Sequence, residues 1–529
     1  MQRKYKKKIQ LPIILRKNQI IYILFHIFAD TTIPKTMKKE LFIYGAAVQG
    51  IQNFIFRTNE LKDIVGASEL VERICTSMFE KEFLQSGEAL VNAAGNVKCL
   101  YSSEDECRKT VLLYPKKVML AAPGITISQA VVKSTEAELR NKFPSLMGQL
   151  EEKLHVQRNK QPKSLTLGLM SIERSRKTGL PAVACVKDEY IDEGTQRKSE
   201  LSDGAKATIK LCEKSFGQKN ISPRNIALNI ADLTGKNDWI AVIHADGNGL
   251  GEVVRRMSST KEELRNFSAK LDKAATEAAQ KAFKAIYTSE SYWQDSVVFP
   301  FRPIVLGGDD MTMICKASLA IPYVKEYLSS FEEATKRHLG ANNGLTACAG
   351  IAYIKSSYPF HYGYDLAETL CSQAKKVTKS PSICQKDKQA PSSLMFHKVQ
   401  SSFIEDYDTM IEKEMTPQEG VRLCAGPYFL RSKDGFWTID KLEETTDKLA
   451  SEEGNAAKTA IRKWMTLMHK DTEMAQQSSK RSKQILSGDL KEVFTNATTP
   501  LQRPGAETTF YPAGDIIDLF TIQNQTTRE

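Results

Sequence analysis

The chain has 529 residues, of which 41% are apolar and 26% are charged. This composition is ordinary for a folded globular protein and excludes a disordered, collagen-like or multi-spanning membrane chain. At about 100–200 residues per domain, the length predicts about three or four domains. Basic residues outnumber acidic ones by 74 to 63, a net charge of +11. Such a modest excess suits a polyanionic partner and, equally well, a mildly basic cytosolic enzyme.

The 10 cysteines are scattered, and no two of them form a C-x-x-C pair. Most lie within apolar runs, which predicts buried thiols in a reducing, cytoplasmic compartment. We therefore expect no zinc site, because the spacing of zinc ligands is missing.

Residues 1–36 differ from the rest of the chain. A basic cluster (Lys4–Lys8) precedes an apolar run (Gln19–Ala29) of about eleven residues, which is too short to span a bilayer. This order resembles a signal peptide, but Met37 opens a segment that reads as the start of an ordinary strand. We interpret residues 1–36 as a non-native extension and keep a signal or anchor segment as the alternative. No membrane partner is expected.

Residues 38–170 are predicted to form a first α/β domain. The expected elements are a strand over 41–47, helical structure over 48–84, a hairpin with strands 89–92 and 97–101 around the tip AAGN, a helix over 129–142 and a strand over 165–170. Polar stretches at 155–164 and 195–224 read as linkers, so residues 171–235 are assigned to a connecting region.

Residues 236–385 show a clearer pattern and are predicted to form a second domain. The expected elements are a strand over 240–245, a helix over 260–287 with a Thr260–Glu263 capping box, strands over 303–306 and 311–315, a helix over 321–338, a strand over 346–354 and a helix over 364–376. This β-α-β-β-α-β order is ferredoxin-like and forms the core of polymerase and cyclase palm domains.

The first domain repeats this order in a rougher form. The predicted fold class is therefore α+β: two tandem ferredoxin-like palm domains, of which the first is degenerate, followed by a helical domain over 390–529. Within that last region, apolar stripes predict helices over 439–450 and 456–469.

Two segments of the second domain combine acidic residues with glycines. His244–Gly251 (HADGNGLG) ends a predicted strand and enters a helix, and Gly307–Asp310 (GGDD) forms the tip of the predicted hairpin. In a palm sheet the first strand and the central hairpin are neighbours. We therefore expect Asp246 to lie beside Asp309 and Asp310.

Three carboxylates at one point repel one another unless a cation lies among them. Mg²⁺ or Mn²⁺ prefers such oxygen ligands, and a pair of ions can activate a 3′-hydroxyl and stabilise the leaving pyrophosphate. We therefore predict that Asp246, Asp309 and Asp310 are both the metal ligands and the catalytic residues.

The glycines have a separate predicted role. They leave room for a nucleotide against the hairpin backbone and leave backbone N–H groups near a helix start, where phosphate binds. A lysine near the end of the last helix could meet a triphosphate, although a solvated helix end explains it nearly as well. The predicted nucleotide-binding residues are Gly247, Asn248, Gly249, Gly251, Gly307, Gly308 and Lys375.

Each signal has a simpler explanation when taken alone. GGDD is common turn chemistry, Asp246-Gly247 could be a plain strand-to-helix turn, and His244 is better explained as a packed strand residue. The two acidic segments together, each at its own station of one β-α-β-β-α-β block, favour a functional site.

At these residues the chain resembles the large subunit of type III CRISPR effector complexes, the Cas10/Cmr2 family. The similarity is strongest in IAVIHADGNGLGEVV, PIVLGGDDMTMIC and LTACAGIAYIKSSYPFHYGYDLAETLCSQAKK, and extends to YGAAVQGIQNFIFRTNELKDIVGASELVERI in the first domain. The resemblance implies a second palm that joins ATP into cyclic oligoadenylates, activated by target RNA within a guide-RNA complex. It places metals on Asp309 and Asp310 with Asp246 as first-strand ligand, and Lys375 on phosphate.

The chain also departs from that family. Asn248 stands where many members carry a second acidic residue, no His-Asp dipeptide of a nuclease domain occurs, and the stretch expected to hold a zinc ribbon has only Cys185. The AAGN tip lacks acids, which implies that the first palm is non-catalytic and could hold a second nucleotide. Three alternatives stay open: a catalytically silent scaffold that binds RNA and protein, a cyclase that uses GTP, and a standalone defence cyclase that works outside a guide-RNA complex.

Overall fold

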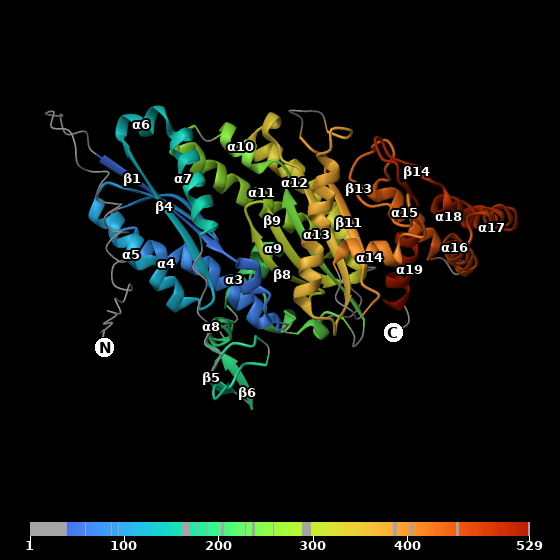
Figure 1. Ribbon diagram of the computed structural model, residues 1–529, viewed down its shortest axis with the longest axis horizontal. Helices are drawn as coiled ribbons and strands as arrows, with labels where there is room; N and C mark the ends of the chain where they lie inside the picture. The colour runs from blue at the N-terminus through green and yellow to red at the C-terminus, as the bar shows by residue number, and fades with distance from the viewer. Residues whose placement is uncertain are drawn as a thin grey trace, which may run out of the picture.

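A computed structural model describes residues 40–526, with gaps at 59, 86, 94, 161–169, 177, 187, 203–205, 228, 235–237, 258, 288–297, 385–388, 402–405 and 451–453 (Figure 1). The expectations for residues 1–36 lie outside this part of the chain, as does most of the strand predicted over 165–170. No helix among the described residues is long and apolar enough to cross a membrane.

The first sheet has four strands in the order β2-β3-β1-β4. Its strands are β1 (Glu40–Gln49), β2 (Glu88–Ala93), β3 (Asn96–Tyr101) and β4 (Thr126–Thr135). Side chains of β1 alternate between two cores: Tyr44 packs with the α3 and α5 side, whereas Ile43 packs with the leucines of α7. The helices around this sheet are α2 (Ile51–Ile55), α3 (Leu61–Cys75), α4 (Ser77–Phe83), α5 (Glu104–Ala121), α6 (Glu136–Asn141) and α7 (Phe143–Arg158).

The helix predicted over 129–142 is wrong in its first half. Residues 126–135 form β4, which pairs antiparallel with β1 along its whole length, and only α6 is helical. The buried positions Ser128, Val132 and Ser134 follow the two-residue period of a strand, and the polar residues between them hid that period.

The second sheet has six strands in the order β13-β11-β10-β7-β9-β8. Its strands are β7 (Trp239–Gly247), β8 (Phe301–Gly307), β9 (Asp310–Lys316), β10 (Ala347–Lys355), β11 (Ser393–Lys398) and β13 (Tyr428–Phe429). The order β8-β9-β7-β10 matches β2-β3-β1-β4 of the first sheet: in both, the first strand lies between the hairpin and the last strand. The α+β class predicted from the sequence is confirmed.

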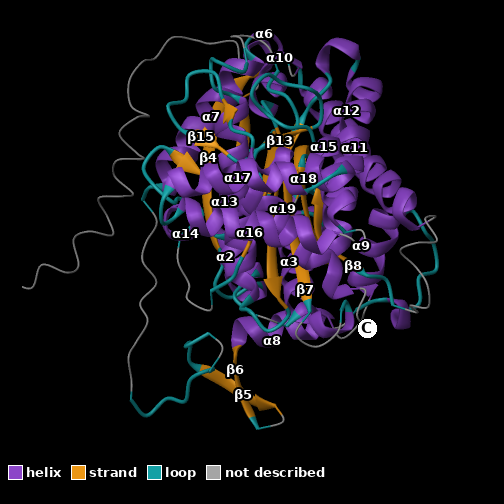
Figure 2. Ribbon diagram, turned by 90° about the vertical axis from the view of Figure 1, so that its right-hand side faces the viewer, coloured by secondary structure: helices purple, strands orange, loops and turns teal. Residues whose placement is uncertain are grey.

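Helices cover both faces of the second sheet (Figure 2). Ala241, Ile243 and Ala245 of β7 face α11 (Lys261–Tyr287) and α12 (Ala320–Leu339). The alternate residues Ile240 and Val242 join a core that contains α13 (Phe360–Thr378) and extends to the first sheet. A single apolar core thus joins the two halves, so the end of β7 lies close to elements of both.

The linker predicted over 195–224 is also corrected by the structure. These residues form α8 (Glu193–Ser202), α9 (Lys206–Phe216) and a short 3₁₀ turn (Pro223–Asn225), preceded by a hairpin of β5 (Ala182–Val186) and β6 (Glu189–Asp192). The region is polar overall, but Cys212 and Phe216 are buried against the α11 side of the second sheet. The hairpin projects from one edge of the molecule (Figure 1).

The C-terminal part is largely helical, and both predicted helices are present. Its helices are α14 (Tyr407–Glu414), α15 (Ile439–Leu449), α16 (Asn455–Met468), α17 (Thr472–Ile485), α18 (Gly488–Thr498) and α19 (Ala513–Thr526). Short strands β12 (Val421–Arg422), β14 (Leu501–Gln502) and β15 (Thr509–Phe510) form a small sheet beside them. β11, which follows the predicted end of the second palm, pairs parallel with β10.

Candidate active site

The end of β7 lies directly against the hairpin that joins β8 to β9. Ala245 of β7 pairs with Met311 of β9, and Gly307 pairs with Asp310 across the hairpin. A Cβ atom added to Gly247 would lie 2.8 Å from the Cβ of Asp309. The absence of a side chain at Gly247 is therefore what allows the two acidic segments to touch.

The predicted glycines leave open space above both loops. Gly249 and Gly308 have left-handed φ angles of +73° and +64°, and a Cβ on either would meet no heavy atom within 4 Å. A Cβ on Gly251, the second residue of α10 (Leu250–Met257), would likewise meet no heavy atom within 4 Å. A Cβ on Gly307 would have only Asp272 near it, at 3.9 Å. A ligand can therefore approach the backbone here.

The three aspartates are electrostatically coupled. Burial, followed by the charge of Asp246 and a hydrogen bond with it, raises the pKa of Asp309 to about 7. Burial and then Asp246 likewise raise the pKa of Asp310 to about 7. The expected approach of Asp246 to the hairpin is thus present, and the crowding makes the ionised forms costly.

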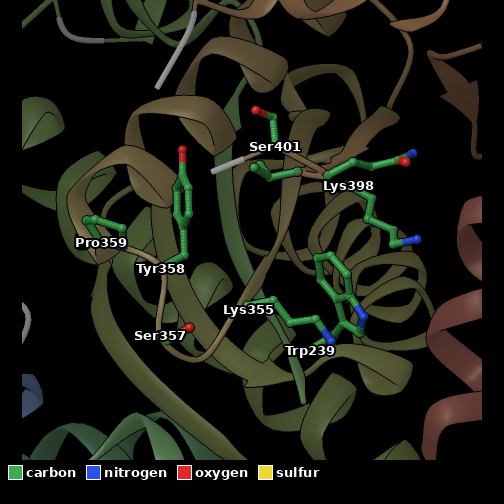
Figure 3. Close-up of a pocket in the computed structure, with 9 residues that line it drawn as sticks. Trp239, Lys355, Ser357, Tyr358, Pro359, Lys398 and Ser401 are labelled. Atoms are coloured by element: carbon green, nitrogen blue, oxygen red, sulfur yellow. The ribbon is translucent and has the colours of Figure 1, made fainter. Parts of the chain in front are cut away.

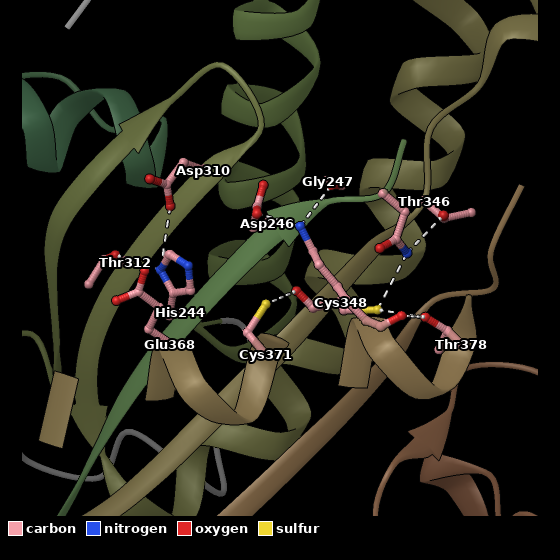
Figure 4. A network of polar contacts seen from close by, with 12 residues as sticks. His244, Asp246, Gly247, Asp310, Thr312, Thr346, Cys348, Glu368, Cys371 and Thr378 are labelled. Carbon is pink, nitrogen blue, oxygen red and sulfur yellow. Dashed lines mark hydrogen bonds and ion pairs between the residues drawn. The ribbon is translucent and has the colours of Figure 1, made fainter. Parts of the chain in front are cut away.

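Asp310 has one oxygen that the protein leaves unpartnered. Its Oδ1 is buried and makes no hydrogen bond among the described residues, although His244 Nδ1 lies 3.5 Å away. Yet 43% of the side chain is exposed, so the carboxylate also reaches the open side of the hairpin. Figure 4 shows Asp310 and His244 facing each other beside the end of β7.

Lys375 of α13 supplies the positive charge next to the aspartates. Its Nζ contacts the carboxylate of Asp246 and donates to the backbone oxygen of Gly247 at 2.9 Å. The side chain is 16% exposed, so this lysine is inside the site and is not a solvated helix end. The same charge lowers the pKa of Asp310, against the larger effects that raise it.

His244 is buried within β7, as the sequence predicted. Burial lowers its pKa, so the imidazole is neutral at physiological pH. Its Nδ1 lies 3.3 Å from Thr312 Oγ1 on the neighbouring strand. This histidine therefore packs in the sheet beneath Asp310 and adds no fixed charge to the site.

Asn248, a predicted nucleotide-binding residue, has a buried side chain that is hydrogen-bonded within the protein. Its Nδ2 donates to Thr346 Oγ1 at 3.1 Å and to Cys348 Sγ at 3.4 Å, and its backbone N–H donates to Thr346 O at 2.8 Å. The residue is 1% exposed. The side-chain amide and the backbone N–H of Asn248 thus both donate to residues at the start of β10 and fix the loop there. This geometry does not support a direct contact with a nucleotide.

Sequence reasoning missed two residues at the wall of the site. Glu368 of α13, two turns before Lys375 on the same face, raises the pKa of Asp310. Gln52 of α2 donates to Glu368 Oε1 at 3.0 Å. The i, i+7 spacing of Glu368 and Lys375 was a readable signal, whereas the contact from Gln52 depends on how the two halves pack.

The donor set suits a hard divalent cation. All three aspartates offer oxygen ligands. Asp310 Oδ1 makes no hydrogen bond among the described residues, and burial, followed by the charge of Asp246, raises the pKa of both hairpin aspartates. Within the described ranges, however, no three His, Cys, Asp or Glu side chains are already grouped as metal ligands. Since Lys375 holds Asp246, gathering all three carboxylates on one ion requires their side chains to rotate.

Comparison with known proteins identifies a domain family whose model covers this site. Residues 239–384 match the family model of the Cas10/Cmr2 second palm domain. No curated protein matches the chain in sequence.

Three solved structures share the fold over most of the chain. A chain of the Csm1-Csm4 cassette in complex with cA4 matches with a TM-score of 0.56, 12% identity and coverage of 92% of this chain and 70% of that one. The same cassette with one ATP matches with a TM-score of 0.54, 12% identity and coverage of 91% of this chain and 70% of that one. The apo cassette matches with a TM-score of 0.52, 14% identity and coverage of 94% of this chain and 72% of that one. At these identities the likeness establishes the fold alone.

Proposed function

We propose that the domain over residues 239–384, which matches the family model of the Cas10/Cmr2 second palm domain, is a metal-dependent nucleotidyl cyclase that joins ATP into cyclic oligoadenylate. The observation that carries the proposal is the convergence of Asp246 with Asp309 and Asp310, where burial, followed by the charge of Asp246, raises the pKa of both hairpin carboxylates. Two under-neutralised carboxylates are costly to keep unless they bind a cation.

In this proposal Asp246, Asp309 and Asp310 hold Mg²⁺ or Mn²⁺. When bound, the metal supplies Lewis-acid stabilisation of the charge that develops on the reacting phosphate. Lys375 orients the triphosphate, because its ammonium group already lies between the Asp246 carboxylate and the Gly247 backbone. The open backbone at Gly249 and Gly308 admits the nucleotide, and the buried Asn248 keeps the first loop in shape.

The first sheet is proposed to be a degenerate palm. Its strand order repeats that of the second sheet, and the tip Ala93–Asn96 contains no acidic residue. Phe56, just after α2, stacks on Tyr364 of α13 with ring centroids 3.8 Å apart. The first half therefore forms one wall of the catalytic site, where a second nucleotide could be held against the first.

The partners belong to the same proposal. Two of the matching Csm1-Csm4 cassettes were solved in complex with one ATP and with cA4, which supports ATP as the substrate here. Guide RNA, target RNA and further type III subunits are the proposed assembly, with RNA as the activator and the cytoplasm as the location. A silent scaffold is the second candidate, favoured by the pairing of Lys375 with Asp246 and by the lack of a preformed group of metal ligands in the described chain.

The decisive experiment is a product assay on the full chain. Purified protein is incubated with ATP or GTP, with Mg²⁺, Mn²⁺ or EDTA, and with or without RNA, and the products are identified by mass spectrometry. We expect cyclic oligoadenylate from the wild type and none from D309N/D310N or with EDTA. Asp434→Asn, which changes an exposed aspartate far along the chain, is the matched control.

Each alternative has its own outcome in that assay. Cyclic products from GTP alone would show that the base is guanine. Wild type that makes no linear or cyclic product under any condition, but binds RNA, would establish the scaffold and overturn the proposal.

A further inference from the structure

A cavity lies at the end of the second sheet opposite to the aspartates. It has a volume of about 450 Å³ and is lined by the first residue of β7, the segment after β10 and the end of β11. Trp239 begins β7 and Asp246 follows seven residues later on the same strand, which separates the two places by about 23 Å. The cavity is therefore distinct from the aspartate site.

The polar character of this cavity is set by two lysines on one indole ring. Lys355 Nζ lies 4.3 Å from the centroid of the Trp239 ring, and Lys398 Nζ lies 5.0 Å from it. The lining contains both lysines and neither aspartate nor glutamate. Two neighbouring cations over an aromatic face favour an anionic ligand between them.

Lys398 is fixed in place from behind. Its Nζ lies 3.4 Å from Asp518 Oδ1 and donates to Thr521 Oγ1 at 2.8 Å, both on α19. Gln400 Nε2 donates to the same Asp518 oxygen at 3.1 Å. Helix α19 thus holds the side chains of Lys398 and Gln400 in place. Their conformational entropy therefore falls less when a ligand binds.

The opposite wall is aromatic. Tyr358 stands across the cavity from Trp239 and the lysines in Figure 3. Its ring makes an edge-to-face contact with Tyr362 at 6.5 Å between centroids, and its backbone N–H donates to Lys355 O at 2.9 Å. A supported ring opposite paired cations can bind a planar group on one side while the lysines bind a phosphate on the other.

We propose that this cavity binds a nucleoside phosphate, with the phosphate on Lys355 and Lys398 and the base against Tyr358. The volume of about 450 Å³ lies within the range of small-ligand pockets. An inorganic anion would leave the aromatic wall and most of that volume unused. The proposal is independent of catalysis at the aspartates, and the nucleoside phosphate has two possible sources: a free nucleotide or one unit of a single strand.

Photo-crosslinking to the full chain in EDTA tests the site and its source. One arm uses 8-azido-AMP, and the other uses a 5′-phosphorylated single-stranded oligonucleotide that carries 4-thiothymidine, with adducts assigned to single residues by mass spectrometry. We expect adducts at Tyr358 or its neighbours Ser357 and Ser401. Adducts with the first probe identify a free nucleotide, and adducts with the second alone identify a strand. Their absence with both probes overturns the proposal, whatever happens at the aspartates.

Variants then test each half of the ligand by equilibrium binding of whichever probe labels the site. Lys355→Glu should weaken binding about tenfold or more, and Tyr358→Ala about fivefold, whereas Tyr358→Phe should bind as wild type. Lys316→Glu is the control, because Lys316 ends β9 at the same end of the sheet and does not line the cavity. Wild-type binding by both Lys355→Glu and Tyr358→Ala, or equal competition by inorganic phosphate and AMP, would overturn the assignment.

Discussion

Asp310→Asn tests whether the hairpin carboxylate is held at a cost to stability. Burial, then Asp246 and Glu368, raise the pKa of Asp310 from 3.8 to about 7. Between those two pH values the folded chain binds more protons than the unfolded chain, so the wild type loses stability as the pH rises from about 4 to about 7. Asparagine keeps the shape of the side chain and removes the charge, so the variant escapes this loss.

The expected gain follows from the size of the pKa change and from the exposure of the group. A rise of about three units would correspond to about 4 kcal/mol in a fully enclosed site. Since 43% of the Asp310 side chain is exposed, solvent screening reduces this figure, and we expect about 1–2 kcal/mol. The free energy of unfolding of Asp310→Asn should therefore exceed that of the wild type by this amount near pH 8 and match it near pH 4.

Urea denaturation in EDTA across this pH range measures the difference, with the exposed Asp434→Asn as a control that should follow the wild type at every pH. Added Mg²⁺ should then stabilise the wild type more than Asp310→Asn, because the variant lacks one proposed ligand. An Asp310→Asn protein that is no more stable than the wild type near pH 8 would refute the reasoning that the site keeps a costly charge.

Two further substitutions test the contacts around the aspartates. Lys375→Met should lower the free energy of unfolding by about 1–2 kcal/mol at neutral pH and weaken ATP binding, because it leaves Asp246 without its counter-charge. The control is Lys376→Met, which changes the exposed neighbouring lysine and should alter neither quantity. Urea denaturation and ATP titration of both variants measure the two effects. Gly247→Ala should cost about 1–3 kcal/mol and abolish product formation, since its Cβ would lie 2.8 Å from that of Asp309. A Gly247→Ala protein with wild-type melting and activity would contradict the packing of the two loops.

The second half of the chain could be predicted because its signals are local and agree with one another. The strand β7 is almost entirely buried and reads as an apolar run. The long helix α11 begins as its capping box indicated: Glu263 N–H donates to Thr260 Oγ1 at 3.2 Å, and Thr260 N–H donates to Glu263 Oε2 at 3.2 Å. The glycine-rich turn lies between two apolar strands that pair as an antiparallel hairpin, as predicted.

Where prediction failed, tertiary contacts outweighed composition. The strand β4 carries Lys133 and Gln129 at partly exposed positions, and pairing with β1 decided its structure in place of helix propensity. In α8 the helix is polar, yet Lys198 is buried over the ring of Phe54 with 4.2 Å between Nζ and the centroid. A lysine is not recognised as a core residue from the sequence, although its long aliphatic part can be buried.

The contacts of the site also divide into those that the sequence predicted and those that only the structure shows. The meeting of Asp246 with the hairpin follows from the strand order of a palm, which the element pattern already contained. The contact between Gln52 and Glu368 joins residues 316 positions apart, and it exists because the first half packs on α13. No local signal reports such packing, so the contribution of the first half to the site wall became visible only in three dimensions.

The charge balance at the aspartates bears on the choice between enzyme and scaffold. Three carboxylates converge, and Lys375 contacts one of them, that of Asp246. These four side chains therefore carry two net negative charges when all are ionised. A framework that only holds partners gains nothing from this arrangement, because asparagine in place of either hairpin aspartate would pack equally well without the repulsion. A divalent cation would balance the remaining charge, and the exchange of Lys375 from Asp246 to a bound phosphate would free the third carboxylate for it. The unfavourable charge of the three converging aspartates is therefore the feature that favours catalysis.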